Sequence, residues 1–225
     1  MVCAMQVKSR ERVREHGEVF TAEREVKAMC DLVKNETERI DSTFLEPACG
    51  DGNFLVEILT RKLAVAKKGY SRSEDELAFQ SVRALMSLYG VDILADNVVR
   101  CRERLFEVWR EVSGVKDEEV VAVALFVLEK NILLGNTLSM KRVDEGRNDL
   151  PEPIVFCEWK FPKGMLVKRR DFDLSVLLRA REKHDLFEAA NYREIQGGEN
   201  GQIVQPRCLR EYPPVDYRKL PEEAV

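Results

Sequence analysis

Apolar residues alternate between two periodicities over roughly the first 140 positions. Short, nearly continuous apolar runs predict buried strands, and they lie at 43–46, 88–92 and 131–138. Longer stretches that repeat an apolar residue every three or four positions predict amphipathic helices, and they lie at 53–68, 75–87, 95–112 and 117–130. The order strand–helix–strand–helix–strand predicts a doubly wound parallel α/β sheet.

The pattern differs on both sides of this core. Residues 5–38 predict a helix, a loop and a second helix with Thr21 as its N-cap. Beyond the core, the sequence predicts a polar loop from 141, a strand near 153–161, a basic stretch at 163–172 and a helix at 173–192. The chain therefore divides into an N-terminal helical segment (1–40), an α/β core (41–140), a divergent region (141–192) and a loop or tail (193–225).

Composition narrows the class of protein. The net charge of −4 gives no overall basic field for nucleic-acid binding, so any DNA contact needs a local patch. No apolar run is long enough for a transmembrane helix, and the N-terminus lacks the apolar core of a signal peptide. The six cysteines form no C-x-x-C pair and there are two histidines, so we expect buried reduced thiols, a cytoplasmic protein, and neither a metal site nor a membrane contact.

The stretch TFLEPACGDGNFLVEIL at 43–59 is the first candidate for chemistry. Gly50 and Gly52 lie between the first strand and its helix, where a glycine turn lets the backbone approach a ligand. The third glycine of a dinucleotide fingerprint is missing, and Glu46 at the strand end would repel a pyrophosphate. Asp92 ends the second strand, where a carboxylate commonly accepts ribose hydroxyls. Two acids and a short glycine turn favour a cationic nucleoside such as S-adenosylmethionine over a purely structural turn.

These motifs closely resemble those of the adenine-N6 DNA methyltransferases of type I and type II restriction–modification systems, over about residues 10–140. The resemblance implies a Rossmann-like S-adenosylmethionine-dependent methyltransferase fold, with Asp92 on the ribose, Ile93 on the adenine face, and Asn136 of NILLGNTL near the adenine edge. In HGEVFTAEREVKAMCDL, Thr21 matches the family's threonine, and Ala22 stands where proline is usual. The residues carried over to the glycine turn are Glu46, Ala48, Gly50, Asp51 and Gly52.

The family's catalytic motif, Asn or Asp followed by Pro-Pro and an aromatic residue, is not found. The segment RNDLPEPIVFCEWKFPKG, where it is expected, has the wrong spacing, and EYPPVDY at 211–217 lacks the Asn and reads as a Pro-rich turn. The catalytic residues are therefore unknown. The resemblance covers the cofactor-binding half, so the fold is expected to be truncated or to have an altered C-terminal half.

Two functions from different classes follow. One is a DNA adenine methyltransferase or its modification subunit, with a protein partner completing the site. The other is a catalytically inactive methyltransferase-like module that binds the cofactor or a protein. Methylation of a small molecule or a protein is a weaker third. Lys168, Arg169 and Arg170 are the candidate DNA contacts, although such charge runs are more often solvated faces.

Overall fold

The computed structural model of the chain describes residues 21–179, 192–195 and 203–222. The residues divide into two compact units, Met1–Leu134 and Gly135–Val225, and each is described by itself. The loop before Thr21 and the side chains of Cys3, His16 and His184 lie outside the described residues.

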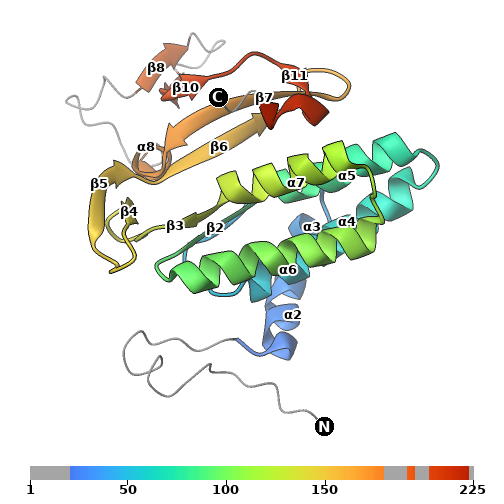
Figure 1. Cartoon of the computed structure of the whole chain (residues 1–225), viewed down its shortest axis with the longest axis horizontal. Coiled ribbons are helices and arrows are strands. Elements are labelled where there is room, and N and C mark those ends of the chain that lie inside the picture. The colour runs from blue at the N-terminus through green and yellow to red at the C-terminus, as the bar shows by residue number, and fades with distance from the viewer. Residues whose placement is uncertain (1–20, 180–191, 196–202, 223–225) are drawn as a thin grey trace. The chain divides into compact units, whose positions relative to one another are not determined.

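A three-stranded parallel sheet organises the first unit (Figure 1). Its strands are β1 (Phe44–Glu46), β2 (Leu88–Asp92) and β3 (Ile132–Leu134), and β2 lies between the other two. The register pairs Glu46 with Gly90 and Asp92 with Leu134, so the carboxyl ends of all three strands meet at one edge. The predicted α/β class with a parallel sheet is confirmed.

Each crossover contains two helices. The described helices of this unit are α2 (Glu23–Leu32), α3 (Lys34–Thr37), α4 (Asn53–Tyr70), α5 (Glu74–Met86), α6 (Ala95–Ser113) and α7 (Glu118–Asn131). The four long ones run side by side, with α4 packed on α5 and α6, and α7 packed on α5 and α6 (Figure 1). The side chain of Asp117 accepts a hydrogen bond from the Glu119 N–H and so caps α7.

Polar side chains inside this core bind the ends of its elements. The Asn131 amide, fully buried at the end of α7, donates to the carbonyls of Leu85, Met86 and Leu88. Lys62 of α4 is also fully buried and donates to the carbonyls of Arg39, Ile40 and Ser42. Periodicity did not indicate either role, because each side chain satisfies a backbone turn that is distant in sequence.

The start of α2 differs from the prediction. The N-cap is Ala22, whose side chain makes no capping hydrogen bond, so the assignment of Thr21 as the N-cap is wrong. Glu23 and Glu25 occupy the first turn, where the helix dipole favours negative charge.

The second unit is mainly antiparallel. Its elements, within the residues that the structure describes, are β4 (Lys141–Val143), β5 (Asp149–Pro153), β6 (Val155–Lys160), β7 (Leu166–Asp173), α8 (Leu174–Arg179), β8 (Tyr192–Ile195), β9 (Ile203–Pro206), β10 (Arg210–Glu211), β11 (Val215–Asp216) and a 3-10 turn, η2 (Tyr217–Lys219). The central strand β7 pairs with β6 along one edge and with β10 and β11 along the other. The predicted strand near 153–161 is confirmed as β6.

Two stretches predicted as loops contain strands. The polar loop from 141 is a hairpin, in which Asp144 accepts from the Asn148 N–H and Arg147 takes a positive φ of 67°. The stretch from 193, predicted as loop or tail, contributes β10 and β11 to the sheet. These strands are too short to show an alternation of apolar and polar residues, so they form because they pair with β7 and not because of the strand propensity of their own residues.

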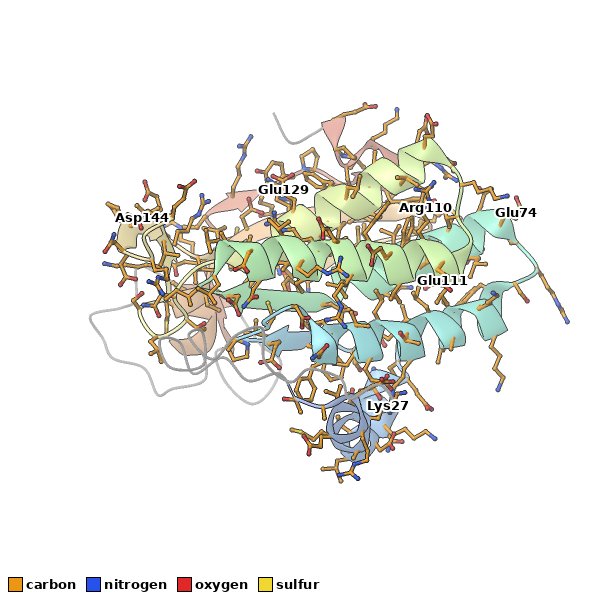
Figure 2. All side chains as sticks on the ribbon, turned by 60° about the horizontal axis from the view of Figure 1, so that its bottom comes forward. Lys27, Glu74, Arg110, Glu111, Glu129 and Asp144 are labelled. Atoms are coloured by element: carbon orange, nitrogen blue, oxygen red, sulfur yellow. The ribbon has the colours of Figure 1, made fainter. Side chains whose placement is uncertain are left out.

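Charged side chains lie on the outer faces of the helices and at the hairpin turn (Figure 2). Lys27, Glu74, Glu111 and Asp144 are all exposed. Over the described ranges, no helix combines the length and the apolar character that a membrane crossing requires.

Candidate functional site: the glycine turn at the sheet edge

The glycine turn is a tight backbone turn between β1 and α4. The Gly52 N–H donates to the Cys49 carbonyl (2.8 Å), and the Cys49 N–H donates to the Val91 carbonyl of β2 (2.9 Å). Gly50 has φ +53° and Gly52 has φ +91°, conformations that L side chains rarely adopt. The turn therefore requires both glycines, as the sequence motif indicates.

Asp92 fixes the turn from the end of β2. Its Oδ2 accepts from the Gly50 N–H (2.8 Å), and its Oδ1 accepts from the Leu94 N–H (2.9 Å) and the Asn97 amide (3.3 Å). A carboxylate oxygen accepts about two hydrogen bonds, so Oδ1 is filled and Oδ2 retains one acceptor site. The carboxylate is thus a structural part of the turn as well as a candidate ligand contact.

Glu46 stands at the end of the neighbouring strand. It is half-buried, and burial raises the pKa of its carboxyl, while a hydrogen bond from the Ala48 backbone lowers it. Among the ion pairs of the described residues, none involves Glu46 or Asp92. Both acids therefore bring negative charge to the sheet edge, balanced by N–H groups rather than by cations.

Arg104 of α6 contacts the turn from its other end. Its Nη1 donates to the Asp51 carbonyl (2.8 Å) and to Asn53 Oδ1 (2.9 Å), and lies 2.9 Å from Asp51 Oδ1. The Asn53 amide in turn donates to the Thr21 carbonyl (3.4 Å). The backbone of Thr21 is thereby connected to the start of α4, and its role in cofactor binding stays a prediction.

Two cysteines lie beneath the turn. Cys49 and Cys101 are both buried, and the hydrogen bond between their thiols, followed by burial, raises the pKa of Cys49. A Cβ at Gly52 would lie 2.7 Å from Cys101 Sγ, and one at Gly90 would lie 3.0 Å from Cys49 Sγ. The thiols fill the space under the turn, in accord with the expectation of buried, unpaired cysteines.

Ile93 and Asn136 complete the residues carried over from the motifs. Ile93 follows Asp92 and is 36% exposed, so its apolar side chain is available at the sheet edge. Asn136 belongs to the second unit, where its amide donates to Asp149 Oδ1 (3.1 Å) and its Oδ1 accepts from the Leu138 N–H (3.1 Å). The structure groups Thr21, Glu46, Ala48, Gly50, Asp51, Gly52, Asp92 and Ile93 in the first unit.

In the second unit, the basic stretch is paired with carboxylates. Each cation on β7 has an acidic partner: Lys168 with Glu211, Arg169 with Asp171, and Arg170 with Glu158. The Arg169–Asp171 pair is bidentate at 2.7 Å and largely buried. DNA phosphates would have to compete with these carboxylates, so contact through this stretch stays a prediction.

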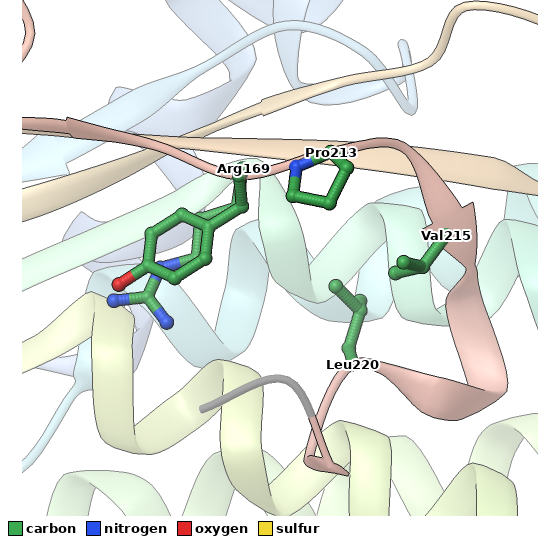
Figure 3. A pocket seen from close by; sticks show the side chains of 5 residues that line it. Arg169, Pro213, Val215 and Leu220 are labelled. Atoms are coloured by element: carbon green, nitrogen blue, oxygen red, sulfur yellow. The ribbon is translucent and has the colours of Figure 1, made fainter. Parts of the chain in front are cut away.

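The segment EYPPVDY borders a small pocket near that ion pair (Figure 3). Arg169, Tyr212, Pro213, Val215 and Leu220 line it, and its volume of about 10 Å³ is at the lower limit for holding one water molecule. The guanidinium groups of Arg169 and Arg210 each lie over the Tyr212 ring, 4.4 Å and 4.6 Å from its centroid. Pro213 and Pro214 themselves are exposed, in the segment that connects β10 with β11.

A comparison of the chain with known protein families, curated proteins and solved structures finds no match. Within the described part of the chain, no group of three His, Cys, Asp or Glu side chains is arranged to hold a metal ion. Sequence reasoning missed Arg104 and Cys101. Both follow the predicted helical period of 95–112, and only the fold shows that they lie against a turn about 50 positions earlier.

Proposed function

We propose that the first unit binds S-adenosylmethionine at the glycine turn, in a Rossmann-like methyltransferase fold. The observation that carries the proposal is the joining of the turn to Asp92 by the Gly50–Asp92 hydrogen bond, at the carboxyl edge of a parallel sheet. Ligands of open α/β sheets bind at this edge, where strand ends and helix N-termini meet.

The chemistry of the edge favours a cationic nucleoside. Glu46 and Asp92 supply negative charge for an ammonium and a sulfonium. The remaining acceptor site of Asp92 Oδ2 suits one ribose hydroxyl, and Ile93 offers an apolar surface to an adenine ring. The start of α4, which no side chain caps, directs backbone N–H groups toward a polar part of the ligand.

DNA adenine-N6 methylation is the activity that the motif resemblance supports, as in a restriction–modification methylase or its modification subunit. The target base must leave the duplex, and a side-chain amide and an aromatic ring must then hold it. This chain carries no Asn-Pro-Pro-aromatic sequence, so we infer that a protein partner supplies those groups and that the complex contacts DNA.

A second candidate function is a catalytically inactive module that binds the cofactor or a protein. The observation that favours it is the position of Pro213 and Pro214 in the second unit, after Tyr212 and between β10 and β11. This Pro-Pro pair follows an aromatic residue instead of preceding one, and no Asn or Asp stands directly before it, so it does not form the family's base-holding motif. In this function the bound cofactor stabilises the fold or a partner contact.

Calorimetric titration of S-adenosylmethionine into the protein tests the site. Glu46→Gln is the sharp variant, because Gln retains an acceptor for the Ala48 N–H and removes only the charge. We expect it to weaken binding by about 1.5–3 kcal/mol, the range for a hydrogen bond to a charged group, with unchanged thermal stability. The control is Glu111→Gln, an exposed acid on α6, which should bind like wild type.

Asp92→Ala alone is a poor probe, because it also leaves the Gly50 and Leu94 N–H groups without their acceptor. Transfer of a tritiated methyl group to DNA, with and without candidate partner proteins, then separates the two functions. Methyl transfer with a partner supports the enzyme, and tight cofactor binding without transfer supports the module. Absence of binding by the wild-type protein contradicts the cofactor proposal itself.

A further inference from the structure

The polar contacts around the glycine turn divide into two groups that approach from opposite ends. Asp92 of β2 accepts from Gly50 at the first end of the turn. Arg104 of α6 donates to the Asp51 carbonyl and to Asn53 Oδ1 at the other end. Asp92 was expected to contact a ribose, and no motif assigns a residue to the other end of the turn.

The guanidinium of Arg104 uses its Nη1 fully. This nitrogen carries two hydrogens, and the Asp51 carbonyl and the Asn53 amide oxygen accept them at 2.8 and 2.9 Å. Asp51 Oδ1, also 2.9 Å away, therefore interacts through charge and makes no hydrogen bond with it. The Arg104 guanidinium thus binds the Asp51 carbonyl and the Asn53 side chain, and it neutralises the charge of the Asp51 carboxylate.

Asn53 extends this contact to a third segment. Because its amide oxygen accepts from Arg104, its NH₂ group must face the opposite way, and there it donates to the Thr21 carbonyl. Arg104 consequently fixes the orientation of an amide that connects the turn with the segment carrying Thr21. The series Arg104, Asn53 and Thr21 joins α6, the start of α4 and the approach to α2.

We infer that Arg104 is a positioning residue of the cofactor site: it holds the glycine turn and, through Asn53, the Thr21 segment in the arrangement that binds S-adenosylmethionine. This inference rests on the proposed function. Arg104 is a quarter exposed and lies at the turn itself, so loss of its contacts should loosen a ligand-binding loop more than the core.

The chain offers a matched control on the same helix. Arg102 also donates to backbone carbonyls, those of Ile132 and Glu129, but these lie at the end of α7 and the start of β3. Arg102→Met therefore removes an arginine of similar contacts away from the turn. Arg104→Lys retains the charge of Arg104 but cannot reproduce its planar donor geometry.

The test combines calorimetric titration of S-adenosylmethionine with hydrogen exchange of the unliganded protein, followed on a peptide that covers residues 48–56. We expect Arg104→Met to weaken binding about 10- to 100-fold, as for the loss of hydrogen bonds to a charged group, and Arg104→Lys to lie between it and wild type. The peptide should exchange faster in Arg104→Met than in wild type. Arg102→Met should match wild type in affinity and in exchange of this peptide, even where its melting temperature falls.

A double-mutant cycle with Asn53→Ala separates positioning from a general structural effect. If Arg104 acts through Asn53, the double variant should lose no more affinity than the weaker-binding single variant. Wild-type binding together with unchanged affinity and exchange in Arg104→Met overturns the inference and leaves the proposed function intact. Absence of wild-type binding overturns both, and the exchange data then still report whether Arg104 holds the turn.

Discussion

Gly52→Ala tests the packing beneath the candidate site most directly. Gly52 has φ +91°, and an added Cβ would lie 2.7 Å from Cys101 Sγ. A non-glycine residue in the left-handed region costs about 1–2 kcal/mol, and a steric overlap in a packed interior costs about 1–3 kcal/mol more. The lower chain entropy of alanine in the unfolded state offsets about 0.4–1 kcal/mol. We therefore expect Gly52→Ala to lower the free energy of unfolding by about 2–4 kcal/mol.

Two other variants separate the steric part from the backbone part. In a Cys101→Ala background the nearest atom to the new methyl group is the Cβ of residue 101, at 3.5 Å, which is an ordinary contact. Gly52→Ala should then cost only about 1 kcal/mol. Gly114→Ala has the same backbone strain, with φ +71°, but meets nothing within 4 Å. It should also cost about 1 kcal/mol.

Urea unfolding followed by tryptophan fluorescence measures these effects. Trp109 is buried in the first unit and Trp159 in the second, so a Trp159→Phe background reports the first unit alone. We expect an interaction energy of about 1–3 kcal/mol between positions 52 and 101. Additivity within about 0.5 kcal/mol would refute the placement of the Cys101 thiol under the turn.

Three further predictions concern buried charges. Burial lowers the pKa of Lys62 to about 7, so between pH 7 and 10.5 the unfolded chain keeps a proton that the folded chain has released, and the free energy of unfolding rises with pH. The difference in this free energy between wild type and Lys62→Met should therefore change by up to about 1.4 kcal/mol per pH unit in that range. A difference that does not change with pH would show that the three carbonyl acceptors keep the ammonium charged. Because burial raises the pKa of Glu46, its carboxyl should begin to protonate at a pH above 4.5 as the pH is lowered, and the affinity for S-adenosylmethionine should fall with it. Glu46→Gln should remove this pH dependence in the same calorimetric titration. Asp171→Asn leaves the buried Arg169 without its bidentate carboxylate and should destabilise the second unit by about 3–5 kcal/mol. Urea unfolding followed by Trp159 fluorescence in a Trp109→Phe background measures this loss. An unchanged urea midpoint would show that water replaces the ion pair.

The local pattern of the sequence determined most of the first unit. Helical periodicity located α4 through α7, and the apolar runs located the strands, because each of these elements buries one face or both. The glycines of the turn were also readable, since positive φ angles demand them. The sequence likewise brought Glu46 and Asp92 to one edge, because parallel strands align their carboxyl ends.

Contacts between distant positions decided the rest. Arg104 and Cys101 are ordinary helix residues until the fold sets α6 against the glycine turn, and Lys62 has the spacing of a core position with the wrong polarity. The strands β10 and β11 have two residues each, too few for a period, and exist because β7 supplies their hydrogen-bond partners. Periodicity records how one element meets its surroundings, whereas the pairing of a polar group with a distant backbone atom depends on which elements meet, and only the tertiary structure fixes that.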